Sequence, residues 1–244
     1  MIRGMRAAAF LVSLLLASST AAQAGSLDLG DRRLEVIDDP VRIAFAPGGP
    51  GTERIAEAVE KAGSRQGWQV TAQGPGQWKL EREEANKHRA TVALLCDSAS
   101  CTINYTDSIN LLYRDRRQSG APLRAIHRTY NTWIRDLAGA LAVTAGGRKN
   151  ITYGFAPLAD VEAVPHVRDG GRKAYRAFLA KAKPRAFAIA ENGAWGWSAP
   201  AQETYSAARY FDSVRRAMDR CETRGAGTCR LYAVDDRVVW DPER

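Results

Sequence analysis

Residues 184–198 read PRAFAIAENGAWGWS, and this stretch decides the fold of the C-terminal part of the chain. Residues 186–190 form an unbroken apolar run of strand length, and residues 194–198 follow it with tryptophan and small side chains. Asn192-Gly193 lies between the two runs, and this dipeptide is the strongest short signal for a tight hairpin turn. The stretch therefore predicts two antiparallel strands.

A helix and a second hairpin follow. The predicted helix covers about residues 201–222, and its apolar face carries Phe211, Val214, Met218 and Cys221. Residues 231–234 and 237–240 then predict two more strands. The order strand–strand–helix–strand–strand indicates a small antiparallel sheet packed with one helix, which we assign to residues 185–244.

The chain before this module alternates strands and helices. Strands are predicted at residues 41–46, 69–72, 77–82, 91–95, 102–105 and 109–113. One helix is predicted to begin at Thr52, and a long amphipathic helix is predicted to run from Pro122 to about Thr144. Residues 25–145 are thus expected to form an N-terminal α+β domain.

Residues 146–184 are the predicted connector between the two units. Gly146-Gly147 begins an irregular stretch and Gly170-Gly171 lies at its end. A short helix starts there, and Asp169 is a candidate cap for it. The predicted fold class is therefore α+β. Two small domains, each an antiparallel sheet with packed helices, are joined by a partly helical connector.

Residues 1–24 carry the pattern of a secretory signal peptide. Arg3 and Arg6 form a positive n-region, the eleven residues 7–17 are mostly apolar, and Ala22-Gln23-Ala24 fits the cleavage rule. An apolar run of this length is too short to cross a bilayer, which takes about 20 residues. We expect cleavage after Ala24, a mature chain without a transmembrane segment, and a location in the periplasm.

The composition is that of a basic globular protein. The 244 residues are 45% hydrophobic and carry 35 Lys and Arg against 27 Asp and Glu, for a net charge of +8. These values exclude collagen-like, low-complexity and wholly disordered chains. Removal of Arg3 and Arg6 with the leader lowers the charge by two, to +6. That charge favours an anionic partner of the cell envelope, although solubility alone would explain it equally well, and no nucleic-acid motif is present.

The four cysteines are expected to form two disulfides. An even number of cysteines in an exported protein indicates bridges, and four cysteines allow three pairings. Cys96 and Cys101 flank a turn-forming tetrapeptide between two predicted strands, while Cys221 ends a helix and Cys229 opens a strand. This local geometry favours Cys96–Cys101 and Cys221–Cys229. Neither spacing matches a zinc or redox motif, so we expect no metal ion and no cofactor.

Two resemblances support this organisation. The C-terminal part resembles a small module of uncharacterised exported proteobacterial proteins. The residues that carry this resemblance are 184–190 (PRAFAIA), 193–197 (GAWGW), Arg220-Cys221 and 229–240 (CRLYAVDDRVVW). The first domain resembles small exported lipoprotein-type domains through residues 105–113 (YTDSINLLY) and 126–133 (IHRTYNTW), although this chain has no cysteine at the cleavage point for a lipid anchor. Neither resemblance implies a catalytic residue.

His127 is the one candidate for catalysis. On the predicted helix it lies where it can meet Asp107 or Ser108, an arrangement that a small periplasmic hydrolase would need. No G-x-S-x-G motif accompanies it, so we interpret His127 as a structural hydrogen-bonding residue and keep the hydrolase as the alternative.

Trp195 and Trp197 are the candidate ligand-binding residues. Their spacing of two places both indoles on one face of a strand. If that face is core, the indoles pack against the Phe211 stripe. If it is exposed, they form an aromatic platform for glycan rings or peptide side chains. Arg209 and Arg216 on the following helix would then add affinity for anionic groups, or else they line a solvated helix face.

These observations favour a non-catalytic binding or interaction protein of the cell envelope over an enzyme. The expected partner is an anionic or glycan envelope component or another envelope protein, and nucleic acid is excluded by compartment and motif content.

Overall fold

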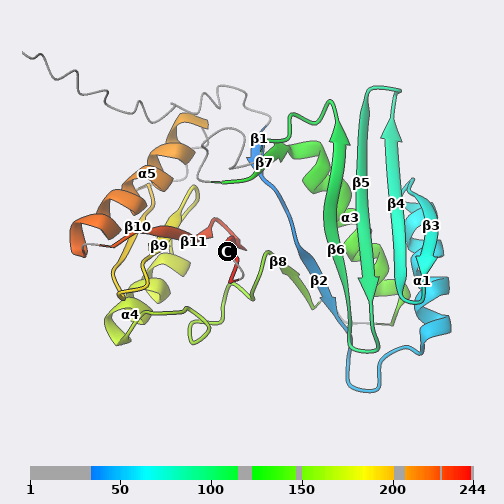
Figure 1. Ribbon diagram of the computed structural model, residues 1–244, viewed down its shortest axis with the longest axis horizontal. Coiled ribbons are helices and arrows are strands. Elements are labelled where there is room, and N and C mark those ends of the chain that lie inside the picture. The colour runs from blue at the N-terminus through cyan, green and yellow to red at the C-terminus, as the bar shows by residue number, and fades with distance from the viewer. Residues whose placement is uncertain (1–33, 115–122, 147–149, 201–206, 226, 243–244) are drawn as a thin grey trace, which may run out of the picture.

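The computed structural model describes residues 34–114, 123–146, 150–200, 207–225 and 227–242, with no side-chain description for residues 207–211. The chain has an α+β architecture, as predicted, with two antiparallel sheets that are each packed with helices (Figure 1). The elements in chain order are β1 (Leu34–Val36), β2 (Val41–Ala44), α1 (Thr52–Arg65), β3 (Gln69–Gly74), β4 (Gln77–Glu84), β5 (His88–Cys96), β6 (Ser100–Ile109), β7 (Ala125–His127), α3 (Arg128–Thr144), β8 (Ile151–Tyr153), α4 (Asp169–Leu179), β9 (Ala186–Ile189), β10 (Trp195–Ser198), α5 (Ala207–Arg224), β11 (Arg230–Val234) and β12 (Arg237–Val238).

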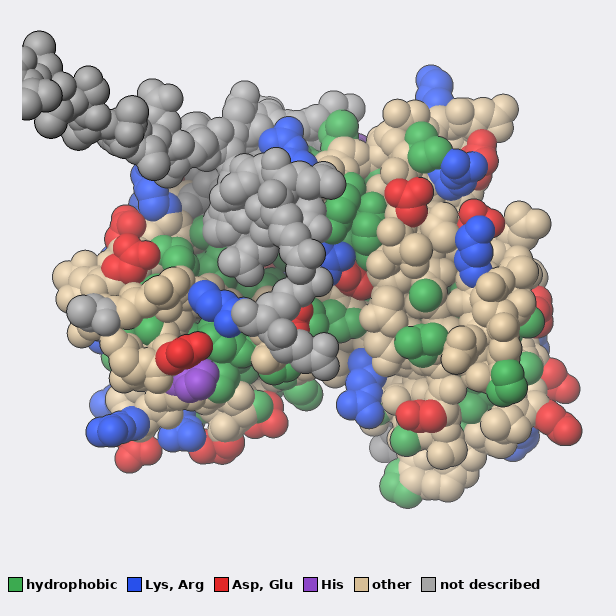
Figure 2. Space-filling model, in the orientation of Figure 1, with side chains coloured by type: hydrophobic (Ala, Val, Ile, Leu, Met, Phe, Trp, Pro, Cys, Tyr) green, Lys and Arg blue, Asp and Glu red, His purple; other side chains and the backbone are tan. Residues whose placement is uncertain are grey.

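The larger sheet has six strands in the order β3-β4-β5-β6-β2-β8, and every pair is antiparallel. Helices α1 and α3 cover one of its faces (Figure 1). Because their sequences are amphipathic, both helices bury an apolar stripe against that face. The opposite face is open to solvent. Charged side chains of both signs and single hydrophobic side chains are scattered over it (Figure 2).

The smaller sheet has four strands in the order β10-β9-β11-β12 and carries a helix on each face. Its central strand β9 is buried on both sides, which explains the unbroken apolar run. Small side chains of β9, such as Ala188, face α5, whereas the larger Phe187 and Ile189 face α4. The alternation of small and large residues therefore sets how closely each helix approaches the sheet.

Both predicted disulfides are confirmed. Cys96 and Cys101 join the ends of β5 and β6, with Cα atoms 4.0 Å apart. Cys221 of α5 is bonded to Cys229 just before β11, with Cα atoms 6.1 Å apart. Disulfides of this kind are typical of proteins from oxidising compartments. The predicted signal peptide, residues 1–24, lies outside the described residues. Within the described part of the chain, no helix is long and apolar enough to span a bilayer.

Two of the predicted elements have different bounds in the structure. Helix α3 begins at Arg128, because Ala125–His127 instead forms strand β7 and pairs with β1. The predicted start at Pro122 lies outside the described residues. The predicted strand at residues 109–113 is wrong beyond Ile109, because Asn110 and Leu112 adopt positive φ angles that end β6.

The two sheets meet at β12. Residues 146–184, the predicted connector, supply β8 to the larger sheet and α4 to the smaller one. Directly after β8, Gly154 forms a bridge with Val238 of β12. A Cβ at Gly154 would lie 2.0 Å from the Val238 carbonyl oxygen, and its φ is +88°, so only glycine fits at this contact. Close packing at this point fixes one sheet against the other.

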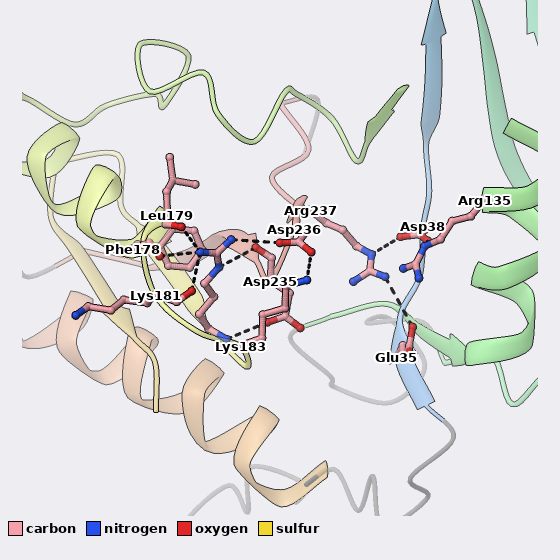
Figure 3. Close-up of polar contacts among 11 residues, drawn as sticks. Glu35, Asp38, Arg135, Phe178, Leu179, Lys181, Lys183, Asp235, Asp236 and Arg237 are labelled. Carbon is pink, nitrogen blue, oxygen red and sulfur yellow. Dashed lines mark hydrogen bonds and ion pairs between the residues drawn. The ribbon is translucent and has the colours of Figure 1, made fainter. Parts of the chain in front are cut away.

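Ion pairs complete the junction between the sheets. The buried carboxylate of Asp38, just after β1, lies between Arg237 of β12 and Arg135 of α3 (Figure 3). Within the smaller unit, the buried guanidinium of Arg185 donates to the carbonyl oxygens of Phe178 and Lys181 and so caps the C-terminal end of α4.

Candidate ligand-binding site

The two tryptophans lie on β10, the edge strand of the smaller sheet, and both are half-buried. Their indoles pack with the side chains beneath α4. The ring of Trp195 lies parallel to that of Phe187, with 6.3 Å between the ring centroids. The core interpretation is thus correct in part, but the helix that covers the indoles is α4 and not the predicted stripe on α5. Phe211, which was expected there, has no described side chain.

Gly196, between the two tryptophans, explains why α5 lies on the other face. A Cβ at this position would lie 2.3 Å from the backbone nitrogen of Cys221 and 2.4 Å from the carbonyl oxygen of Ala217. The backbone of α5 therefore rests directly on the backbone of β10. This contact positions the C-terminal end of α5 beside the start of β10, where Trp195 lies.

A pocket of about 280 Å³ opens at that place. It is lined by Asn192, Gly193, Ala194, Trp195, Arg224 and Gly225. The guanidinium carbon of Arg224 lies 3.7 Å from the centroid of the Trp195 ring, which is close cation–π contact. Arg224 is exposed, and such a contact at an exposed site is worth about 0.5–1 kcal/mol. The guanidinium is therefore held over the indole but is easily displaced.

The β9–β10 turn forms one wall of the pocket. Asn192 accepts a hydrogen bond from the backbone N–H of Ala194 at 3.0 Å, and Gly193 takes the positive φ of +86° that the tight turn requires. The predicted hairpin turn thus also shapes the site.

The loop after α5 forms the opposite wall, and the Cys221–Cys229 disulfide closes it. A Cβ at Gly225 would lie 2.9 Å from the Cβ of Ala194, and one at Gly227 would lie 2.8 Å from the Asn192 side-chain nitrogen. A side chain at position 225 would thus collide with Ala194, and one at position 227 would require the Asn192 amide to move. The disulfide and the glycines together hold Arg224 beside Trp195.

Arg216, named from the sequence, is not among the described residues that line this pocket. Arg216 donates from Nε to the hydroxyl of Ser198 at 3.2 Å, so it ties α5 to the edge strand. Arg220 donates to the carbonyl oxygen of Trp197 at 2.7 Å and does the same. The side chain of Arg209 lies outside the described residues.

Sequence reasoning missed that Arg224 and Asn192 line this pocket. Arg224 resembles the other exposed arginines of its helix in sequence, and Asn192 was recognised only as a turn residue. One signal was present: Arg224 lies inside the predicted Cys221–Cys229 ring, which also carries two glycines. A ring of that size restricts where its side chains can point.

His127 occupies a structural position. It is the N-cap of α3, and its Nδ1 accepts a hydrogen bond from the backbone N–H of Thr129 at 3.2 Å. Its ring also stacks on that of His88, with 5.7 Å between the centroids. The Nδ1 lone pair is thus engaged in capping the helix.

The hydroxyl of Ser108 has a phenol as its partner. Its Oγ lies 2.9 Å from the hydroxyl of Tyr105. Burial raises the pKa of Tyr105 to about 12, so this phenol stays protonated near neutral pH and cannot serve as a general base there. Asp107, the other proposed partner of His127, pairs in register with Thr91 of β5. The hydroxyl of Ser108 is therefore paired with a phenol, which does not activate a serine nucleophile.

Comparisons with protein-family models, with curated proteins and with solved structures found no match for this chain. Among the described residues, no group of three or more His, Cys, Asp or Glu side chains is placed to hold a metal ion. The geometry of the pocket is therefore the basis for the function proposed below.

Proposed function

We propose that this chain is an exported, non-catalytic binding protein of the cell envelope that holds an anionic or glycan envelope component in the pocket between Trp195 and Arg224. The observation that carries the proposal is the exposed guanidinium of Arg224 over the half-buried indole of Trp195, at the mouth of a pocket of about 280 Å³. An indole face binds rings and a guanidinium binds anions, so one small site offers both interactions.

The cysteines support the exported location. Both pairs are oxidised, and such bonds form and persist outside the cytosol. The pattern of residues 1–24 supports the same location. The capping role of His127 supports a binding function over hydrolysis. Its Nδ1 accepts a hydrogen bond, so the neutral ring carries its proton on Nε2, the nitrogen that a triad base would use to accept the serine proton.

Co-sedimentation of the purified mature protein with a proteobacterial envelope fraction tests the proposal. We expect saturable binding that Trp195→Ala and Arg224→Ala each weaken about fivefold, the factor that ~1 kcal/mol represents. Arg215→Ala is the matched control, because it removes one exposed positive charge from the same helix outside the pocket. Equal binding by all four proteins would contradict the proposed site.

Export has its own test. Expression of the full chain in a proteobacterial host should yield periplasmic protein whose N-terminal residue is Gly25 and whose intact mass shows four oxidised cysteines. Full-length protein that is retained in the cytoplasm would contradict this part of the proposal.

A further inference from the structure

The pocket has room for about one ring of a ligand. Its volume of about 280 Å³ lies just below the range of roughly 300–1,000 Å³ that drug-sized molecules occupy. A nucleotide or a peptide of several residues would exceed it. The part of the ligand that the pocket holds is therefore a small molecule or one unit of a larger one.

The walls favour a sugar ring over an aromatic ring. Of the described residues that line the pocket, Trp195 alone is aromatic. The others supply the amide of Asn192, the guanidinium of Arg224 and the backbone and Cβ atoms of small residues. A pyranose has an apolar C–H face that stacks on an indole and a rim of hydroxyls that bond to amides. A flat aromatic ligand would leave its second face without an apolar partner.

Arg224 adds the preference for charge. Among the described residues that line the pocket, none is acidic and Arg224 is the one cation. A guanidinium binds a carboxylate with two parallel hydrogen bonds, and this pairing is stronger than the cation–π contact that Arg224 makes at an exposed site. The binding free energy that an acidic ligand gains by pairing with Arg224 thus exceeds the free energy lost when Arg224 leaves its cation–π contact with Trp195.

We propose that the pocket binds a single sugar residue that carries a carboxylate. In the complex the sugar ring takes the place of the guanidinium over Trp195, and Arg224 turns to pair with the carboxylate. The inference rests on the proposed function and specifies its ligand class. The proposed function itself requires only that some envelope component binds at this pocket.

Nuclear magnetic resonance titration of the mature, oxidised protein with sodium glucuronate tests the inference. Glucose and sodium acetate are the matched probes, because the first has the ring without the charge and the second has the charge without the ring. The readout is the indole N–H resonance of Trp195, which is assigned by its absence from the spectrum of Trp195→Phe. We expect saturable shifts with glucuronate, and a Kd about tenfold or more below those of glucose and acetate.

Two arginine-to-lysine variants distinguish bidentate pairing with the carboxylate from a general effect of net charge. Arg224→Lys keeps the positive charge but loses the planar fork, so we expect the Kd for glucuronate to rise about fivefold. Arg215→Lys makes the same change outside the pocket and should leave this Kd unaltered.

Each probe has a result that overturns the inference. Equal Kd values for glucuronate and glucose would remove the role of the carboxylate, and equal values for glucuronate and acetate would remove the role of the ring. No shift of the indole resonance up to about 50 mM glucuronate would exclude the ligand class, since one weak ring-and-charge contact already gives millimolar affinity. If envelope binding still depends on Trp195 and Arg224 in that case, the proposed function stands and only the ligand class is wrong. If both experiments fail, both proposals fail.

Discussion

The guanidinium of Arg237 bonds to the carboxylate of Asp38 across 199 positions of the sequence, and this ion pair joins the two sheets (Figure 3). The side chain of Asp38 is only 1% exposed and that of Arg237 only 9%. Arg135 of α3 approaches the second oxygen of Asp38 at 2.8 Å. A carboxylate that contacts cations from both halves of the molecule ties the stability of one half to the other.

Arg237→Gln should lower the free energy of unfolding by about 3 kcal/mol, because it leaves the buried carboxylate of Asp38 with only the partly exposed Arg135 as a cation. Urea unfolding followed by tryptophan fluorescence measures the loss. The double variant Asp38→Asn/Arg237→Gln should recover part of it, since no uncompensated charge then remains.

Arg215→Gln serves as the control for this prediction. Arg215 pairs with Asp212 on the exposed surface of α5, so its loss should change the stability by no more than about 0.5 kcal/mol. Similar losses of unfolding free energy for Arg215→Gln and Arg237→Gln would show that the buried pair at the junction stabilises the protein no more than an exposed pair does.

Gly196→Ala should be strongly destabilising, because the new methyl group would overlap backbone atoms of α5 at 2.3 and 2.4 Å. Overpacking typically costs 1–3 kcal/mol, and here the obstructing atoms are backbone, so we expect about 3 kcal/mol or more in chemical unfolding. Gly139→Ala is the contrasting change. Nothing lies within 4 Å of its Cβ and the residue is inside α3, so this substitution should stabilise the protein by about 0.5–1 kcal/mol.

Much of the fold is encoded in local patterns. The hairpin of β9 and β10 follows from an apolar run and a turn dipeptide, and both disulfides follow from cysteines that lie five and eight positions apart. Strands β1, β7 and β8 have three residues each, too few to establish an alternation, and their partners lie far along the chain. Pairing with such distant partners decides their structure. Local sequence patterns therefore predicted that helix α3 begins at Pro122, before β7, and did not predict β8.

The candidate site was predictable only in part for a similar reason. The spacing of Trp195 and Trp197 places them on one face, but alternation along a strand does not say which helix covers that face. Gly196 carries that information, since only a residue without a side chain admits the backbone of α5. The position of Arg224 depends on a disulfide-closed loop, and no helical pattern reports it. The two family resemblances remain predictions.

The two disulfides should differ in their effect on binding. Cys221→Ser/Cys229→Ser removes a ring that we estimate at about 2.5 kcal/mol, and Cys96→Ser/Cys101→Ser removes one of about 2 kcal/mol. Both variants should lose comparable stability in urea unfolding. Only the first releases the loop beside Arg224, so it alone should weaken envelope binding, about fivefold by co-sedimentation. A matching loss in the second variant would contradict this role of the loop.

Asp97 should make the β5–β6 hairpin sensitive to acid. Its Oδ1 accepts hydrogen bonds from the backbone N–H groups of Ala99 at 2.8 Å and Ser100 at 2.7 Å, and these bonds lower the pKa of Asp97 below its ordinary value of 3.8. Because the folded-state pKa is the lower one, the stabilisation is complete above pH 3.8 and is lost as the pH falls through the folded-state pKa.

The measurement is the urea midpoint of wild type and Asp97→Ala as a function of pH. Wild type should be the more stable protein at pH 6, and the difference should shrink as the pH falls below 3.8. Other carboxylates titrate in both proteins and cancel in the comparison. A difference that stays constant down to pH 2 would show that the ionised form of Asp97 is not what stabilises the turn.

Two substitutions of His127 distinguish a role as helix cap from a role as catalytic base. Since its Nδ1 accepts the hydrogen bond from the Thr129 N–H, His127→Ala should lower the free energy of unfolding by about 1 kcal/mol. His127→Asn should lose less than half of that, because asparagine is among the best N-cap residues and supplies a side-chain oxygen to the same N–H group. Thermal and urea unfolding of the two variants measure the difference. Equal losses would show that the cap does not stabilise α3, and any hydrolysis abolished by His127→Asn in a folded protein would restore the catalytic interpretation.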